Sequence, residues 1–136
     1  MGPEDTDVLY WLQVAEYDLE VAQGMLDKGF YLYVGFMCHQ CIEKTLKAVF
    51  VEKNHDVPPY SHNLNMLMEK CGIGRDAPED FLDFIDRLSP LNIQARYPAY
   101  KDDIKSLIKQ DYAKIILRET RKYQLWLAKR IDTSKT

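Results

Sequence analysis

The sequence carries no excess of positive charge, no long apolar run and few cysteines, and each shortage excludes a class of protein. Its 136 residues include 18 Lys and Arg against 21 Asp and Glu, so net charge does not draw the whole molecule onto a phosphate backbone, and nucleic-acid binding would need a local patch. No apolar run approaches the roughly 20 residues that span a bilayer, and the start, Met1–Asp5, is acidic where a signal peptide is basic and then apolar. The three cysteines are an odd number, which is typical of reduced thiols and not of a secreted disulfide framework. We therefore predict a cytoplasmic, unprocessed protein.

Common catalytic and metal-binding signatures are also missing. The chain has no glycine-rich phosphate loop, no His-Glu-x-x-His zinc motif and no Gly-x-Ser-x-Gly elbow. Cys38-His39-x-Cys41, together with Cys71, has the residue types of a tetrahedral zinc site. However, His39 projects roughly 100° away from Cys38 on a helix, and both Cys38 and Cys41 fall on an apolar stripe, where a free thiol packs as a small hydrophobe. We expect no metal and no cofactor.

Length and composition favour one packed domain. With 46% apolar and 29% charged residues, a chain of this size can bury a core without disulfides or metals, and we assign residues 1–136 to a single domain. The sequence shows no internal repeat, no low-complexity segment and no alternating strand pattern. It therefore predicts an all-α protein.

Three stretches have the apolar period of a long helix. The first, residues 6–28, has Asp5 or Thr6 as a plausible N-cap and ends at Gly29. The second, residues 31–53, adds apolar residues on further faces, which predicts the most buried helix. The third covers residues 104–131. The three stripes are Val8, Leu12, Ala15, Leu19, Ala22 and Leu26; Val34, Cys38, Cys41, Thr45 and Ala48; and Ile108, Tyr112, Ile115, Glu119, Tyr123, Trp126 and Arg130.

Two short connecting helices complete the predicted architecture. Ser61 is expected to cap a helix from His62 to Lys70 that stops at Cys71-Gly72. Pro78 suits the first turn of another, which ends before Pro90. Its inner side would carry Phe81, Leu82, Ile85 and Leu88, and residues 91–100 would follow as an irregular crossing. The fold predicted is an up-and-down helical bundle of three long helices and two short ones.

A polar stripe interrupts the second long helix. Gln40, Glu43, Lys44 and Lys47 recur at steps of three and four residues, which places them on one broad face. One interpretation is an ordinary ion pair between Glu43 and Lys47, in the favourable acid-before-base order. The other is a polar groove or a dimer face, because the rest of this helix is too apolar to be solvated.

Two further places carry residues that suit a phosphate or a base. His62, at the expected start of a helix, can contact a phosphate with free backbone donors, or can simply cap or pack. Arg96-Tyr97-Pro98 and Tyr100 set a guanidinium beside two aromatic rings, a combination that binds phosphate and stacks on a base. The alternative is that Arg96 bridges to an acid on a long helix while the tyrosines cover the core.

Four parts of the chain, in this order, resemble the HEPN domain (higher eukaryotes and prokaryotes nucleotide-binding). They are Tyr10-Trp11 with Ala15, Asp18-Leu19 and Ala22; Phe36–Ala48, which reads FMCHQCIEKTLKA; Ser61–Leu64; and Arg96–Pro98. The match covers nearly the whole chain. Its specific parts are the Gln-x-x-Glu-Lys-x-x-Lys-Ala segment and the later Arg-Tyr-Pro.

The resemblance implies a helical bundle that forms homodimers and is often encoded beside a minimal nucleotidyltransferase, in a toxin–antitoxin-like pair. Many HEPN proteins are metal-independent ribonucleases that use an arginine followed, after four to six residues, by a histidine. Here His39, His55 and His62 all precede the first arginine, Arg75, so that motif is absent. Asn63 stands where members frequently carry aspartate.

Two functions follow as hypotheses. The first is a non-catalytic HEPN-like subunit that homodimerises, associates with a nucleotidyltransferase-like partner and holds a nucleotide or its substrate. Its polar groove would comprise Gln40, Glu43, Lys44, Lys47, His62, Arg96 and Tyr97. The second is a HEPN ribonuclease toxin with a non-standard site, in which His62 and Arg96 meet in space.

Overall fold

The computed structural model describes residues 6–74, 77–96 and 108–131, and of residues 93–96 only the backbone. Over these ranges the chain is helical and contains no strand, which confirms the predicted all-α class. The helices are α1 (Val8–Lys28), α2 (Tyr31–Asn54), α3 (Leu64–Cys71), α4 (Glu79–Arg96) and α6 (Gln110–Ala128). None of these helices has the combination of length and apolar character that crossing a bilayer demands.

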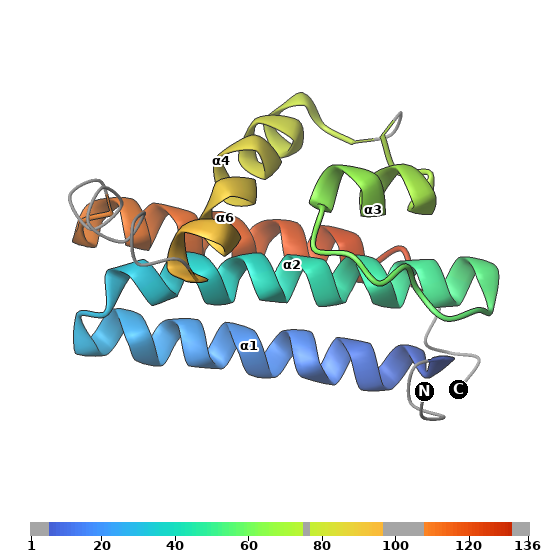
Figure 1. Cartoon of the computed structure of the whole chain (residues 1–136), viewed down its shortest axis with the longest axis horizontal. Helices are drawn as coiled ribbons and strands as arrows, with labels where there is room; N and C mark the ends of the chain where they lie inside the picture. The colour runs from blue at the N-terminus through green and yellow to red at the C-terminus, as the bar shows by residue number, and fades with distance from the viewer. Residues whose placement is uncertain (1–5, 75–76, 97–107, 132–136) are drawn as a thin grey trace.

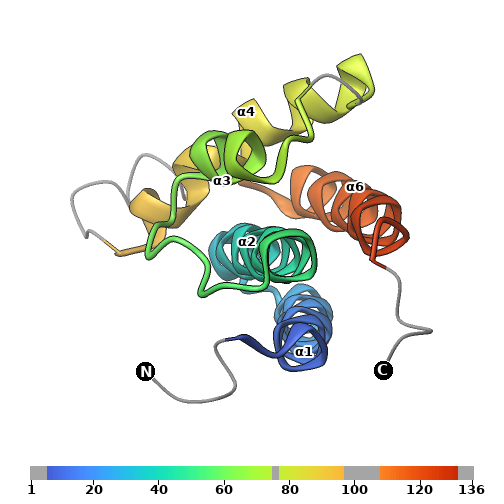
Figure 2. The ribbon, with the colours of Figure 1, turned by 90° about the vertical axis from the view of Figure 1, so that its right-hand side faces the viewer.

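The five helices are arranged around α2 (Figures 1 and 2). α1 runs antiparallel to α2, and α6 lies along a neighbouring side of α2, where it also contacts α1. α3 and α4 cross the remaining side of α2. Because α2 packs against all four other helices, side chains on almost every part of its surface are removed from water.

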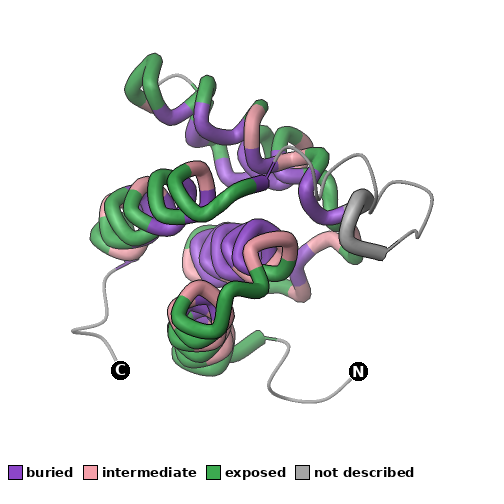
Figure 3. The backbone as a smooth tube through the Cα atoms, turned by 90° about the vertical axis from the view of Figure 1, so that its left-hand side faces the viewer, coloured by how far each residue is buried: buried purple, intermediate pink, exposed green. Residues whose placement is uncertain are grey.

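Burial follows this arrangement closely (Figure 3). Fourteen residues of α2 are buried, against four of α1, so the prediction that the second helix is the most enclosed is confirmed. The predicted stripe of α2, from Val34 through Cys38, Cys41 and Thr45 to Ala48, is buried throughout. The all-round apolar pattern in the sequence reflects contact with neighbours on every side.

α1 and α3 begin at side-chain caps that lie one or two residues from the predicted ones. Asp7 caps α1 by accepting from the backbone N–H of Leu9 at 3.0 Å, so neither Asp5 nor Thr6 has that role. Asn63 caps α3 by accepting from the N–H of Met66 at 3.1 Å, and the expected cap at Ser61 is therefore wrong. The predicted C-terminal stops are confirmed at Gly29 and Gly72, which both adopt the left-handed conformation that glycine tolerates best.

α4 differs most from the prediction. It runs for 18 residues, straight through Pro90, so it is not a short helix and residues 91–96 are not an irregular crossing. The chain continues as a helix because the residues after the proline are anchored on α2. Leu91 is buried against Gly35 of α2. A Cβ atom added to Gly35 would lie only 2.8 Å from the Cδ1 atom of Leu91. Packing on α2 thus offsets the cost of a proline in the helix interior.

Two apolar faces are rotated relative to the prediction. Ile115, on the expected stripe of α6, is 39% exposed, whereas Ala113 and Thr120 are buried. Leu82, expected on the inner side of α4, is exposed, and Phe84 is buried in its place. The inner face of α6 includes a small residue, Ala113, and a polar one, Thr120, so the position of its large apolar residues alone does not predict that face. The last helix, expected over residues 104–131, is shorter in the structure: Ile108 and Lys109 precede it, and it ends at Ala128. Residues 104–107 of the expected helix lie outside the described residues.

Candidate functional site

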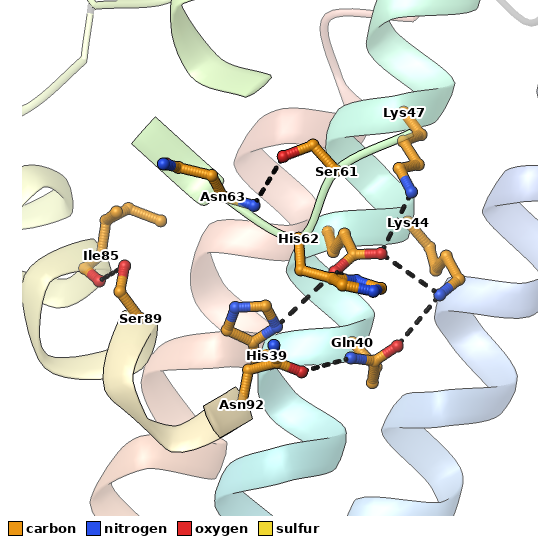
Figure 4. A network of polar contacts seen from close by, with 11 residues as sticks. His39, Gln40, Lys44, Lys47, Ser61, His62, Asn63, Ile85, Ser89 and Asn92 are labelled. Atoms are coloured by element: carbon orange, nitrogen blue, oxygen red, sulfur yellow. Dashed lines mark hydrogen bonds and ion pairs between the residues drawn. The ribbon is translucent and has the colours of Figure 1, made fainter. Parts of the chain in front are cut away.

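Glu43 is the centre of a polar cluster on α2 (Figure 4). One carboxylate oxygen, Oε1, lies 2.8 Å from the Nδ1 atom of His62, which comes from the segment before α3. The other oxygen, Oε2, lies 3.1 Å from the Nζ atom of Lys47 and 3.5 Å from that of Lys44. The structure therefore brings together residues that are 19 positions apart in the sequence around a single carboxylate.

The cluster continues through amide side chains to α4. Gln40 accepts a hydrogen bond from Lys44 at 3.0 Å and donates one to the Oδ1 atom of Asn92 at 3.1 Å. Asn92 is buried, and it lies two residues after Pro90 in the part of α4 that the sequence predicts to be irregular. Sequence reasoning missed Asn92 for that reason.

His39 is a second residue that the sequence analysis did not place here. Its side chain is buried, and its Nδ1 atom lies 3.8 Å from the Oε1 atom of Glu43. The signal was present, because His39 and Glu43 are four residues apart and so share a helix face. The Cys38-His39-x-Cys41 pattern indicated only a zinc ligand as a possible role for His39.

Exposure divides the cluster into an interior and a surface part. The Glu43 side chain is 0% exposed and that of Lys47 is 8% exposed. His62, at 42%, and Lys44, at 20%, are the cluster members that reach solvent most. A ligand approaching from solvent would therefore meet His62 and Lys44 first.

The surrounding cations hold Glu43 in its ionised form. Burial by itself would raise the pKa of Glu43, but the charge of Lys47, the hydrogen bond with His62 and the charge of Lys44 outweigh it, so the pKa is lowered. Nearby on α1, burial raises the pKa of Asp18, and the charge of Lys44 opposes that rise. A carboxylate with a lowered pKa is a weak proton acceptor, so Glu43 is suited to anchoring its neighbours and not to acting as a general base.

The ionised Glu43 also fixes how His62 is presented. A carboxylate only accepts hydrogen bonds, so the Nδ1 atom of His62 carries the hydrogen that joins them. The Nε2 atom is then left to meet a ligand. A carboxylate behind an imidazole orients the ring in the same way in hydrolytic and metal sites.

Of the seven residues predicted for a groove, five meet in this cluster. These are Gln40, Glu43, Lys44, Lys47 and His62. Arg96 is the last residue of α4, and its side chain lies outside the described residues, as does the whole of Tyr97. Their position beside the cluster stays a prediction.

The cysteines form no part of this cluster. Cys38, Cys41 and Cys71 are buried free thiols, and burial raises the pKa of Cys38 to about 12 and that of Cys71 to about 11. Cys71 donates to the carbonyl oxygen of Leu46 at 3.2 Å. Over residues 6–74, 77–96 and 108–131, no three His, Cys, Asp or Glu side chains gather in a way that could hold a metal ion.

Glu43 gives the stability of the fold a pH dependence. A carboxyl group with a lowered pKa stabilises the folded state fully above its ordinary value of 4.5, and this contribution is lost as the pH falls through the folded-state value. We expect the free energy of unfolding, measured with urea from about pH 7 to about pH 2.5, to fall more steeply in acid for the wild type than for Glu43→Gln. Hydrogen bonds from Arg87 also lower the pKa of Glu119, but that contribution is common to both proteins and cancels in the difference. Parallel curves over the whole range would show that Glu43 has no such role.

Comparison with known proteins gives a family and a shared fold. The sequence profile described as HEPN domain matches residues 8–130. The crystal structure of TT1696 from Thermus thermophilus has the same fold, with a TM-score of 0.79 and 24% sequence identity over 91% of this chain and 98% of that one. No curated protein shows significant sequence similarity to the chain.

Proposed function

The chain belongs to the HEPN domain family, and from this we propose that it is a non-catalytic HEPN subunit that forms a homodimer, associates with a nucleotidyltransferase-like partner and holds a nucleotide or its substrate. The observation that carries the proposal is that two lysines of the cluster neutralise the carboxylate of Glu43. Lys47 and Lys44 both lie against the buried carboxylate of Glu43, at 3.1 and 3.5 Å. Because its carboxylate is already paired with cations, the cluster suits binding of a ligand at its surface better than catalysis.

Phosphodiester cleavage would need more groups than the cluster offers. It requires a general base, a general acid and a cation on the scissile phosphate. Among the described residues of the cluster, one imidazole, that of His62, reaches solvent, while His39 is buried. Glu43, with its lowered pKa, is a poor base. These features support binding over cleavage.

A nucleotide would meet the cluster at His62. The ammonium group of Lys44 is positioned to donate to a phosphate, and the Nε2 atom of His62, which accepts hydrogen bonds while Nδ1 carries the hydrogen, can accept from a hydroxyl of the sugar. Tyr60 is 99% exposed, and its ring centroid lies 6.4 Å from that of His62, so an aromatic surface for a base is close at hand. In this proposal Arg96 and Tyr97 would add a second cation and ring.

Calorimetric titration of ATP and of GTP tests nucleotide binding directly. We expect binding by the wild type, and a loss of at least about tenfold in His62→Asn, which removes the oriented imidazole. His55→Asn is the matched control, because His55 is an exposed histidine at the C-terminal end of α2, in a left-handed conformation that asparagine tolerates. No heat of binding to the wild type, or equal affinities of the two variants, would refute the nucleotide part of the proposal.

Assembly is tested separately. Sedimentation of the pure chain should give a species of twice 16.0 kDa, and co-expression with a nucleotidyltransferase encoded beside it should give a co-purifying complex. Tyr17 on α1 and Leu125 on α6 are exposed apolar side chains that such interfaces would remove from water. A 16.0 kDa species at every working concentration would refute the homodimer.

A ribonuclease with a non-standard site is the second candidate. The observation in its favour is the 2.8 Å contact between His62 and a buried carboxylate, which orients the imidazole as a proton acceptor. Incubation of labelled RNA with the dimeric protein distinguishes the two functions. Cleavage by the wild type that is lost in His62→Asn and kept in His55→Asn would favour the ribonuclease and overturn the non-catalytic proposal.

A further inference from the structure

The outer side of α6 carries a stripe of cations. On the side opposite the buried face of this helix lie, at steps of three, four and seven residues, Ile115, Arg118, Lys122 and Lys129, all of them exposed. In the ranges that the structure describes, no acid lies within ion-pairing distance of the three cations. We call Arg118, Lys122 and Lys129 the α6 basic stripe, which is about 16 Å long.

The outer side of α4 carries a stripe of the opposite charge. Glu79, Asp83 and Asp86 recur at steps of four and three residues, so they share one side of the helix, and all three are exposed. Among the residues that the structure describes, no cation lies within ion-pairing distance of these acids. Glu79, in the first turn, suits the helix dipole, but Asp83 and Asp86 lie beyond that turn. We call these three residues the α4 acidic stripe.

The two stripes adjoin and are held in fixed positions (Figure 2). Arg87 of α4 donates two hydrogen bonds of 2.7 Å to the carboxylate of Glu119 on α6, and this pair joins the two helices. Between the helices lies a hollow of about 290 Å³, which is lined by Asp80 from α4 and by Lys122 and Lys129 from α6. One side of the molecule therefore presents a basic and an acidic surface next to each other, already in place before any partner arrives.

We propose that a second copy of the chain binds on this side, with the α6 basic stripe of each copy lying on the α4 acidic stripe of the other. The proposal rests on the homodimer of the proposed function and adds which faces meet. In a twofold dimer both copies use the same surface, so each stripe of one copy contacts the opposite stripe of its partner. Because the two stripes adjoin, one axis close to the hollow brings both pairs of stripes together.

The charge pattern favours a second copy over other occupants. Soluble proteins usually intersperse charges of both signs on their surfaces, whereas here the signs are separated onto two helices. The α4 acidic stripe repels a polyanion, and the α6 basic stripe repels a basic partner, so the occupant needs both signs in the reverse arrangement. A twofold-related copy presents that arrangement. Ile115 on α6 and Leu82 on α4, each 39% exposed, add apolar surface that the contact removes from water.

Sedimentation of charge-reversed variants tests the proposal. Asp83→Lys/Asp86→Lys gives both stripes positive charge, and Arg118→Glu/Lys122→Glu gives both an excess of negative charge. At a concentration where the wild type is a dimer, we expect each variant alone to sediment as a species of 16.0 kDa. An equimolar mixture of the two variants should recover the dimer, because each reversed stripe then meets one of the opposite charge. The dissociation constant of the wild-type dimer should rise about tenfold when the salt is raised from about 0.05 M to about 0.5 M.

The matched control is Glu16→Lys/Glu20→Lys, which makes the same change of charge at two exposed positions on α1 and should dimerise as the wild type does. An equal loss of dimer in this control would show repulsion by net charge alone and overturn the proposal. Dimers that persist in both reversed variants, or a mixture that stays monomeric, would also overturn it. Persistent dimers would refute this interface and leave the homodimer standing, whereas a wild type of 16.0 kDa at every concentration would refute the homodimer itself.

Discussion

Replacing Glu43 with glutamine is expected to lower the free energy of unfolding at neutral pH by about 3–5 kcal/mol. The carboxylate is fully buried and lies 3.1 Å from the ammonium group of Lys47, which is itself only 8% exposed. Glutamine fills nearly the same space but carries no charge, so Lys47 would lose its counter-charge and keep only the Trp11 ring, whose centroid lies 5.6 Å from its Nζ atom. Urea denaturation, followed by circular dichroism, measures the difference.

Two further variants isolate the cause of that loss. Glu20→Gln makes the same chemical change at an exposed position on α1 and should alter stability by no more than about 0.5 kcal/mol. Glu43→Leu/Lys47→Met removes both buried charges and should be more stable than Glu43→Gln, because it leaves no buried charge unpaired. Lys44, which also lies near Glu43, is 20% exposed and keeps its hydrogen bond with Gln40. If the double variant is no more stable than the single one, the buried lysine is not the reason for the loss.

The sequence predicts the helices well where one local signal suffices. The apolar period of α1 and α2 predicts their ends to within two residues, and Gly29 and Gly72 mark two C-termini correctly. The sequence fails to predict a helix end where contacts between distant segments determine it. Pro90 is locally typical of a helix stop, but Leu91 packs into the space left by Gly35, which lies 56 positions earlier in the sequence.

The polar cluster shows the same division. The spacing of Gln40, Glu43, Lys44 and Lys47 predicts that they share a face, because one helix carries all of them. It does not predict that Glu43 would be buried there with a histidine from another segment, at 2.8 Å. That contact depends on how the segment before α3 crosses α2, and no short-range pattern encodes such a crossing.

Leu46→Ala is expected to cost about 2–5 kcal/mol of folding free energy. Leu46 is 0% exposed on the most enclosed helix, and its backbone carbonyl accepts from the thiol of Cys71 on α3, so the packing around it has little freedom to close a cavity. Leu125→Ala is the matched control, because Leu125 is 59% exposed on α6 and its truncation should change stability by no more than about 0.5 kcal/mol. Both values come from urea denaturation at the same pH. Equal urea midpoints for the two variants would mean that the side chain of Leu46 does not face the core. That result would contradict the central position of α2 in the bundle.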